Sequence, residues 1–284
     1  MQTKIILEIG CNHQGDIETA EKMIIEAARL GVWGVKFQKR DIDSIPIKIR
    51  EAPRDPVNNF GNTYEAHRRA LEFSLKQIQH LKEFTENLDL QFVCSAFDPV
   101  SVKGLILAGV KWIKFPSQLF LNEKMHDTYK ESKTTNNKLI VSTGMHTKDE
   151  IDSGLVMNSC NINVILHCIS VYPAKIEMCN LSTVDILIKD LEWYDIGVGY
   201  SSHEIEAGAV PYAVAIGAEW IERHFTLCKG WKGHDHRTVS STPEEIEKMI
   251  IEIKRAEKIK GLESRPISPD EMIVAKKFRA NYGN

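Results

Sequence analysis

Two lysines and two histidines that could bind anions or a metal ion stand at the ends of four strand-like runs. Lys36 belongs to GVKFQ, Lys114 to KWIKFPS, His203 to GVGYSSH and His224 to WIERHF. Ammonium groups bind phosphates and carboxylates through charge-assisted hydrogen bonds, and neutral imidazoles are common ligands of divalent metal ions. Gathered at one end of parallel strands, these side chains would suit a phosphorylated, carboxylated substrate together with a divalent ion. Their placement indicates an enzyme.

The segments that must position these side chains alternate between strand and helix eight times. The predicted strands span residues 4–10, 32–38, 90–95, 111–116, 138–142, 162–168, 195–201 and 219–225, and the predicted helices span 17–31, 70–88, 98–108, 121–131, 147–158, 180–190, 206–217 and 243–259. Several strands are apolar throughout, as expected when helices cover both faces of a parallel sheet. Eight such units favour a closed (β/α)8 TIM barrel over an open sheet, with the site at the carboxyl ends of the strands.

One catalytic barrel is predicted over residues 1–260, followed by a C-terminal tail or the start of a linker at 261–284. Residues 39–69 interrupt the alternation with three prolines, a glycine and several basic residues. Long insertions after barrel strands are usually active-site loops or lids, so the segment is interpreted as one. The alternative is a surface loop without a function.

The composition excludes several classes of protein. A net charge of −3 gives no overall attraction to nucleic acid or to a membrane surface, so local cations must bind any anionic ligand. The six cysteines include no CxxC pair, which disfavours a zinc site or a disulfide framework and fits a reducing cytoplasm. Cys94 and Cys168 lie in apolar runs and are interpreted as small buried hydrophobes. With no signal-peptide pattern and no apolar run that could cross a bilayer, we expect a cytoplasmic enzyme.

Further polar side chains stand at the strand ends and in the loops after them. In chain order these are Glu8, Asn12, His13, Gln38, Ser95, Ser117, Ser142, Thr143, His167, Tyr172, Ser201, Glu222, Asp235 and His236. Serine hydroxyls beside Lys36 and Lys114 suit a phosphate and a carboxylate. The alternative is that each lysine only pairs with a carboxylate, Glu8 or Glu222, because an unpaired buried ammonium group is costly.

Three local patterns have two interpretations each. Residues 142–145 (Ser-Thr-Gly-Met) either present backbone N–H groups to an anion at a helix N-terminus or form a plain turn. His203 and His224, 21 residues apart, form a candidate metal-ligand pair with open positions for water and substrate, and residues 234–236 (His-Asp-His) are the rival set. Tyr172 either donates a hydrogen bond to the substrate or caps the barrel rim.

The order and spacing of eight motifs resemble those of the sialic acid synthases, from about residue 4 to residue 259. The motifs are EIGCNHQGD (8–16), VKFQ (35–38), IKFPS (113–117), LIVSTGM (139–145), LHCISVYP (166–173), GYSSH (199–203), GAEWIERHFT (217–226) and GHDH (233–236). Members of this family condense phosphoenolpyruvate (PEP) with an N-acyl hexosamine, such as N-acetylmannosamine, to give a nonulosonic acid and phosphate. The resemblance therefore implies PEP and such a sugar as substrates.

The resemblance also implies roles for single residues. Glu8 matches a carboxylate that places or deprotonates water, and His203 and His224 match the ligands of a divalent ion, usually manganese, with magnesium or cobalt as alternatives. The ion would polarise the aldehyde that C3 of PEP attacks. The positions that contact PEP match Lys36, Ser95, Lys114, Ser117, Ser142, Tyr172 and Ser201, and Asp235 matches a position that contacts the sugar. The predicted catalytic residues are Glu8, Lys36, Lys114 and Glu222, and the predicted substrate-binding residues are Gln38, Ser95, Ser117, Ser142, Ser170, Tyr172, Ser201 and Asp235.

Some positions depart from the family pattern. Leu119 stands where a glutamate is frequent, Ser170 where asparagine is common and Ser202 where aspartate is common. These differences bear on the sugar acceptor more than on PEP. Full-length relatives carry a C-terminal antifreeze-like domain that places an arginine in the partner's site, and we expect a catalytic barrel without that domain. The resemblance otherwise implies a homodimer.

Two other functions are alternatives. A related barrel synthase would use a phosphorylated aldose to make a 3-deoxy-2-ulosonic acid phosphate, and Arg40, Lys48, Arg50 and Arg54 could bind the acceptor phosphate. A non-catalytic paralogue would bind PEP or sugar without turnover. The presence of Glu8 argues against the second alternative, because binding alone needs no group that activates water.

Overall fold

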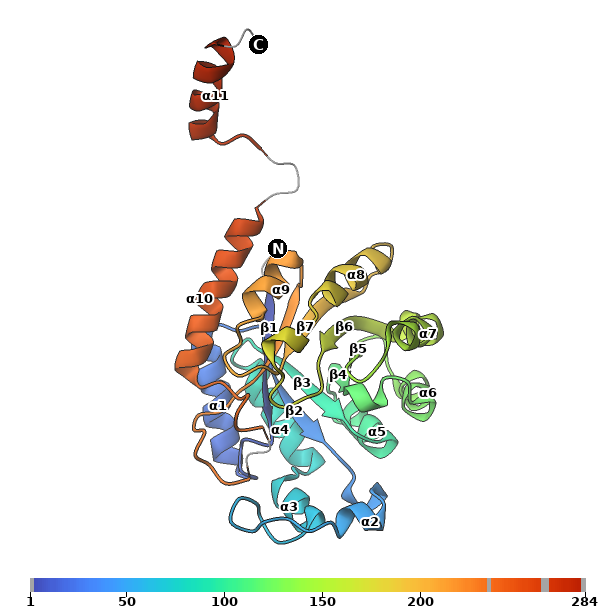
Figure 1. Cartoon of the computed structure of the whole chain (residues 1–284). Helices are drawn as coiled ribbons and strands as arrows, with labels where there is room; N and C mark the ends of the chain where they lie inside the picture. The colour runs from blue at the N-terminus through green and yellow to red at the C-terminus, as the bar shows by residue number, and fades with distance from the viewer. Residues whose placement is uncertain (1–2, 234–235, 262–265, 282–284) are drawn as a thin grey trace.

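Eight parallel strands close into a barrel in which each strand pairs with its neighbours in chain order (Figure 1). The computed structural model describes residues 3–233, 236–261 and 266–281. The strands are β1 (Lys4–Gly10), β2 (Gly34–Lys39), β3 (Gln91–Ala96), β4 (Trp112–Phe115), β5 (Lys138–Ser142), β6 (Ile162–Cys168), β7 (Gly197–Ser202) and β8 (Trp220–His224). β8 pairs with β1 and closes the ring. The predicted (β/α)8 barrel is confirmed.

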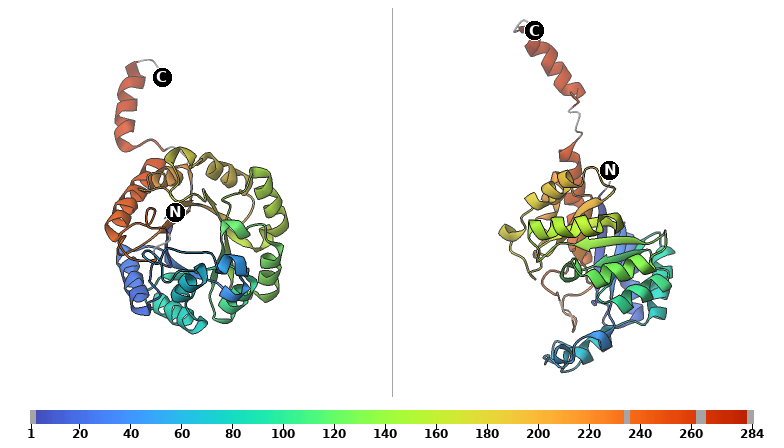
Figure 2. Two further views of the ribbon diagram at one scale, coloured as in Figure 1. Left: turned by 60° about the horizontal axis from the view of Figure 1, so that its bottom comes forward. Right: turned by 90° about the vertical axis from the view of Figure 1, so that its right-hand side faces the viewer.

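Helices surround the barrel as an outer ring, seen end-on in the left view of Figure 2. They are α1 (Ile17–Leu30), α4 (Leu75–Glu86), α5 (Pro99–Leu107), α6 (Glu123–Ser132), α7 (Lys148–Asn158), α8 (Ser182–Asp190), α9 (Val210–Ile216) and α10 (Pro243–Lys260). Side-chain caps set several starts: Asp16 and Asp98 accept hydrogen bonds from the first turns of α1 and α5. None of the described helices is long and apolar enough to cross a membrane.

Two predicted helix starts were wrong for identifiable reasons. The helix predicted at 70–88 is broken, because Ser74 forms a capping box with Gln77 and α4 begins only at Leu75. The helix predicted at 206–217 begins at Val210, where Pro211 occupies the first turn and needs no hydrogen-bond partner for an N–H group.

The predicted loop at 39–69 contains regular structure. It holds a 3-10 turn (Ile42–Ser44), the short helix α2 (Ile47–Arg50) and most of helix α3 (Tyr64–Leu71). An isolated bridge between Pro53 and Thr63 closes the part between the two helices. Buried residues of α3 hold the segment against the barrel.

The barrel interior is apolar at the amino end and polar at the carboxyl end. Trp33, Trp112 and Trp220 pack together, with ring centroids 4.7–5.5 Å apart. Because residues i and i+2 of a strand share one face, each apolar residue is followed by a polar one pointing the same way. Ile6 precedes Glu8 in this manner, and Trp220 precedes Glu222. The alternation places polar side chains at the end of the barrel where the strands finish.

A helix that the sequence analysis did not predict follows the barrel. Helix α11 (Pro269–Asn281) lies within the segment interpreted as a tail or linker. It stands away from the barrel in Figure 1, and several of its apolar side chains are exposed: Met272, Ile273, Val274 and Phe278.

Candidate active site

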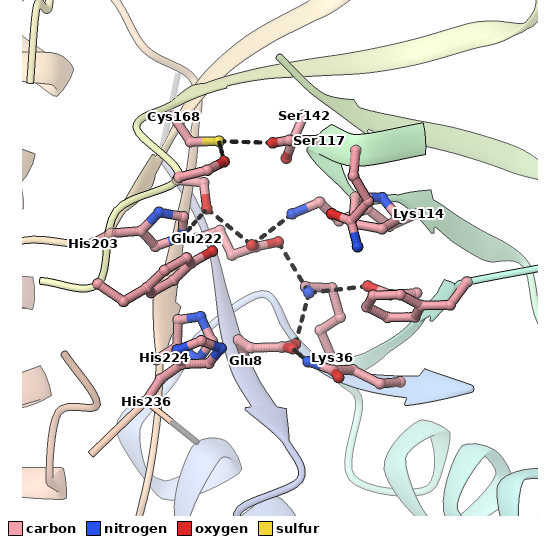
Figure 3. Close-up of a pocket in the computed structure, with 18 of the residues that line it drawn as sticks. Glu8, Lys36, Lys114, Ser117, Ser142, Cys168, His203, Glu222, His224 and His236 are labelled. Atoms are coloured by element: carbon pink, nitrogen blue, oxygen red, sulfur yellow. Dashed lines mark hydrogen bonds and ion pairs between the residues drawn. The ribbon is translucent and has the colours of Figure 1, made fainter. Parts of the chain in front are cut away.

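Four buried charged side chains form a row of alternating sign inside the carboxyl end of the barrel (Figure 3). Lys36 Nζ lies 2.7 Å from Glu8 Oε2 and 3.6 Å from Glu222 Oε2. Lys114 Nζ lies 2.6 Å from Glu222 Oε1. The order is therefore Glu8, Lys36, Glu222, Lys114, and each residue comes from a different strand. The side chains are no more than 5% exposed.

The inner and outer members of this row differ electrostatically. Burial works against the charge of Lys36, but Glu222 and Glu8 outweigh it and raise its pKa. Burial also works against the charge of Glu222, but Lys114 and Lys36 lower its pKa to about 2. The outer groups have fewer opposite charges. Burial raises the pKa of Glu8, with Glu222 adding to it, and burial lowers the pKa of Lys114, with Lys36 adding to it.

Lys36 and Glu222, in the centre of the row, therefore each have two opposite charges beside them, whereas Glu8 and Lys114, at its ends, each have one. Lys114 lacks a second negative neighbour in the described chain, and an anionic ligand would supply one. Glu8 has a proton affinity above that of an ordinary carboxyl group, which suits it to accept and donate protons. The predicted pairing of the lysines with Glu8 and Glu222 is correct. Both lysines nevertheless also line the cavity.

Hydroxyl groups surround the row. Lys36 Nζ donates to Ser95 Oγ (3.1 Å), and Ser201 Oγ donates to Glu222 Oε1 (3.0 Å). Ser117 Oγ lies 3.2 Å from Cys168 Sγ. Ser142 Oγ is buried and has no hydrogen-bond partner within the described part of the chain. A ligand oxygen is the natural partner for such a group, because a buried unsatisfied hydroxyl is costly.

The segment at 142–145 is a plain turn and not a helix N-terminus. Thr143 N donates to Leu166 O, and α7 begins at Lys148 behind its own capping box of Thr147 and Glu150. Of the two interpretations, the structure supports the plain turn, because the first turn of α7 is already capped. Gly144 matters for another reason: a Cβ atom there would lie 2.3 Å from Ser170 Oγ, 2.8 Å from Cys168 Sγ and 2.9 Å from Ser117 Oγ.

Gly144→Ala is expected to lower kcat/KM for an anionic substrate by about tenfold or more, because overpacking of about 1–3 kcal/mol would displace the surrounding hydroxyls. Steady-state kinetics would measure this. The matched control is Gly208→Ala, whose nearest neighbour would be Ile176 Cδ1 at an ordinary 3.8 Å. Equal activity of the two variants would show that the hydroxyls around Gly144 do not bind substrate.

Imidazoles line the opposite wall. The rings of His203 and His224 have centroids 5.7 Å apart, and His236 lies 4.8 Å from His224. His203 Nδ1 lies 2.7 Å from Ile169 O, so this nitrogen carries the hydrogen. Nε2, which lies 3.2 Å from Ser201 Oγ, keeps its lone pair. Burial lowers the pKa of His203 to about 3 and that of His224 well below its ordinary value. Both rings are therefore neutral, as metal ligands must be.

These residues fit a catalytic divalent ion better than a structural one. Neutral imidazoles held by a backbone carbonyl are the donor set that such ions take in proteins. The described residues contain no group of three or more His, Cys, Asp or Glu side chains arranged to hold a metal. An ion held by two imidazoles would have positions open for water and substrate oxygens. His234 and Asp235 of the rival set lie outside the described residues, and His236 stands beside the His203–His224 pair.

One cavity of about 340 Å³ unites these groups. Every predicted site residue that the structure describes lines it: Glu8, Lys36, Gln38, Ser95, Lys114, Ser117, Ser142, Ser170, Tyr172, Ser201, His203, Glu222 and His224. Asp235 lies outside the described residues. Tyr172 stands among the imidazoles, with its ring centroid 4.3 Å from that of His203. The two lysines and two histidines thus face one space.

Four strand-end polar residues do not line this cavity. Asn12 donates to Phe225 O, and His13 stacks on Phe73. Thr143 is held against β6, and His167 Nε2 lies 2.8 Å from Cys179 O. Each of these side chains is satisfied within the protein, so proximity to a strand end was not enough to make it part of the site.

The sequence reasoning missed several cavity residues. Tyr64 and Arg68 come from α3, Phe97 follows β3, and Cys168 is the last residue of β6. Cys168 is buried as expected, but its sulfur reaches the cavity wall, and its place at a strand end could have signalled this. Leu119, which stands where a glutamate is frequent in the family, packs against the apolar core. Its neighbour Gln118 lines the cavity.

Of the four basic residues proposed for an acceptor phosphate, only Arg40 lines the cavity. Lys48 and Arg54 are exposed. Arg50 is paired with Asp43 and Glu65. The predicted role of the 39–69 segment as a loop over the site is thus supported by Arg40 and Tyr64, with Arg68 just beyond its end.

Comparisons with known proteins agree on one family. A model described as the NeuB family matches residues 23–265. The N-acetylneuraminate-9-phosphate synthase of Drosophila melanogaster is 34% identical over 276 residues, which cover 95% of this chain and 71% of that protein. The N,N'-diacetyllegionaminic acid synthase of Legionella pneumophila is 32% identical over 279 residues, which cover 95% and 76%. A solved sialic acid synthetase from Leptospira borgpetersenii has a TM-score of 0.83 at 27% identity and covers 99% of this chain and 92% of its own.

Proposed function

The chain belongs to the NeuB family of sialic acid and related nonulosonic acid synthases, and we propose that it condenses PEP with an N-acyl hexosamine to a nonulosonic acid and phosphate. The observation that carries this proposal is the row of alternating charges facing two neutral imidazoles across one cavity. PEP presents a phosphate and a carboxylate, and the row ends in a lysine that lacks a second negative neighbour in the described chain.

Lys114 and Lys36 hold the anionic groups of PEP in this proposal. A phosphate or carboxylate beside Lys114 offsets the burial and the repulsion by Lys36 that lower the pKa of Lys114. Ser142, Ser117 and Ser95 add hydroxyl donors on the same side of the cavity. Charge-assisted hydrogen bonds in a buried site orient the ligand as well as bind it.

Glu8 moves the proton of the attacking water. C3 of PEP forms a bond to the aldehyde carbon of the acceptor, the C=O π electrons move to the aldehyde oxygen, which takes up a proton, and positive charge develops at C2. Water adds to C2 as Glu8 takes its proton. The C2 hydroxyl then loses its remaining proton as phosphate leaves from the tetrahedral intermediate. Gln38 donates a hydrogen bond to Glu8 Oε1, Lys36 forms an ion pair with Glu8 Oε2, and together they fix the orientation of the carboxylate. The raised pKa of Glu8, caused by burial, favours this proton transfer.

His203 and His224 would hold a divalent ion, with manganese as the first candidate. When bound, the ion would polarise the aldehyde of the acceptor. Burial keeps both rings neutral by lowering their pKa values. The hydrogen bond between His203 Nδ1 and Ile169 O orients the His203 ring. Tyr172 lies against the His203 ring and limits its rotation.

The direct test is phosphate release from PEP with a panel of N-acyl hexosamines, with and without Mn²⁺. We expect release with at least one N-acyl hexosamine. Release only with aldose phosphates that lack an N-acyl group would favour a 3-deoxy-2-ulosonic acid phosphate synthase. Tight binding of PEP without release for any acceptor, simple aldoses included, would favour a non-catalytic paralogue.

His203→Ala and His224→Ala are each expected to weaken Mn²⁺ binding by about tenfold or more, because each removes a ligand from the ion. Calorimetric titration of the apoprotein with Mn²⁺ measures this independently of activity. His80→Ala, which changes an exposed histidine on α4, is the control. Unchanged Mn²⁺ affinity in the double variant would move the metal site to the segment around His236.

A further inference from the structure

A second cationic group lies in the same cavity, outside the row of charges. It consists of Arg40, which directly follows β2, and Arg68 of α3. Arg40 lies four residues beyond Lys36, which along a strand is about 13 Å between backbone positions. The side chains of Glu8 and Gln38 lie between the Lys36 ammonium group and the Arg40 guanidinium group, and each is bonded to the next. Neither arginine takes part in the proposed condensation steps.

Arg40 is buried in an unusual setting for a guanidinium group. It is only 7% exposed, and its Cζ lies 3.5 Å from the ring centroid of Phe97. Its Nη2 donates to Gln38 Oε1 (2.7 Å). Its Nη1 is buried and has no hydrogen-bond partner among the described residues. One edge of a planar donor group is therefore left for a ligand.

No carboxylate of the described chain forms an ion pair with the Arg40 guanidinium. The nearest candidate, Glu72, accepts from the backbone N of Arg40 (2.8 Å) and pairs with Lys39 Nζ (2.6 Å). Burial and then the charge of Arg68 lower the pKa of Arg40. A buried cation beside a like charge is costly unless a counter-charge arrives.

The Arg40 guanidinium group lies outside the row in which the lysines and glutamates balance one another. Lys36 and Lys114 are balanced by Glu8 and Glu222. Arg40 and Arg68 add two guanidinium groups to the cavity wall. Gln38 joins the two regions, because its amide donates to Glu8 and its Oε1 accepts from Arg40. An anionic group bound at Arg40 would thus lie one side chain away from the proposed catalytic carboxylate.

We propose that Arg40, assisted by Arg68, binds a phosphate carried by the acceptor at the end remote from its aldehyde, so that the enzyme acts on a phosphorylated N-acyl hexosamine. This rests on the proposed condensation and narrows its acceptor. Family membership leaves the choice open, since the names of its relatives include products with and without a phosphate. The guanidinium favours phosphate because its N–H edge matches two phosphate oxygens.

The test compares N-acetylmannosamine 6-phosphate with N-acetylmannosamine in PEP-dependent phosphate release with Mn²⁺. We expect the phosphorylated acceptor to have the higher kcat/KM. Arg40→Gln should lower kcat/KM for it by about 10- to 100-fold, the value of one charge-assisted hydrogen-bonded contact. The decisive readout is the ratio of kcat/KM for the two acceptors, because loss of the Arg40 bond to Gln38 disturbs Glu8 equally with both of them. Lys48→Gln makes the same charge change on the exposed surface and should alter neither acceptor.

A measurement of acceptor binding distinguishes a failure of the phosphate site at Arg40 from a failure of the proposed condensation. Calorimetry without PEP should show that Arg40→Gln, but not Lys48→Gln, weakens binding of N-acetylmannosamine 6-phosphate. That result would keep the phosphate site even if no condensation were observed. Equal kcat/KM for the two acceptors, or an Arg40→Gln variant that keeps the preference, would overturn the inference and leave the condensation standing. Arg40→Lys, which keeps the charge but loses the planar fork, should give a smaller loss and guards against misfolding of Arg40→Gln.

Discussion

Lys114→Met is expected to lower kcat/KM for PEP by about 30-fold to several thousand-fold, corresponding to about 2–5 kcal/mol for truncating one partner of a buried charge pair. Lys114 ends the row of charges and has only Glu222 as a close opposite charge. Its removal deletes the cation that has the fewest opposite charges within the protein and that we propose binds the anionic substrate. Phosphate release at varied PEP, together with calorimetric PEP binding, measures the effect.

Two further variants separate substrate binding from stability. Lys111→Met changes an exposed lysine just before β4 and should leave kinetics unchanged. Lys114→Met leaves Glu222 with Lys36 at 3.6 Å and Ser201 at 3.0 Å, so part of its cost is a poorly paired carboxylate. A double-mutant cycle that combines Lys114→Met with Glu222→Gln isolates the cost of the poorly paired carboxylate. Unaltered PEP affinity in folded Lys114→Met would remove Lys114 from the PEP site.

Glu8→Gln is expected to reduce kcat by about 10²- to 10⁴-fold, the usual contribution of a general acid–base group. The amide keeps the shape of the side chain and can still meet Lys36 and Gln38, but it cannot take a proton from water. PEP affinity should be retained or increased, because one negative charge is lost beside Lys36. Rapid-quench or steady-state phosphate release gives kcat, and calorimetry gives the PEP dissociation constant.

The control for Glu8→Gln is Glu18→Gln, an exposed carboxylate in the first turn of α1. A kcat close to that of the unaltered protein in Glu8→Gln would exclude Glu8 as the group that activates water. A loss of PEP binding without a change in kcat would instead give Glu8 a positioning role through Lys36.

Local sequence predicted the elements because the signals that form them are local. The observed strands begin within two residues of their predicted starts, since alternation and apolar runs are read over a few neighbours. The errors occurred where one residue changed the backbone, as Ser74 did before α4. Strand order then followed from chain order, because a barrel of βα units pairs each strand with the next.

Cys168 and His167 show what local sequence could not decide. They are adjacent at the end of β6, yet Cys168 reaches the cavity and His167 binds the backbone of Cys179 outside it. Successive strand residues face opposite sides, and a polar type does not reveal which side is inward. Only the register of the closed barrel fixes this.

The sequence by itself determined which residue types stand at the carboxyl ends of the strands, and hence that an anion and a metal ion could be bound there. Tertiary structure decided their partners. Glu8 and Glu222 are 214 positions apart in the chain and share Lys36 only because β8 closes on β1. Arg40 and Arg68 meet one cavity only because α3 folds back over the barrel. Such contacts depend on long-range packing, because burial and charge act through space and not along the chain.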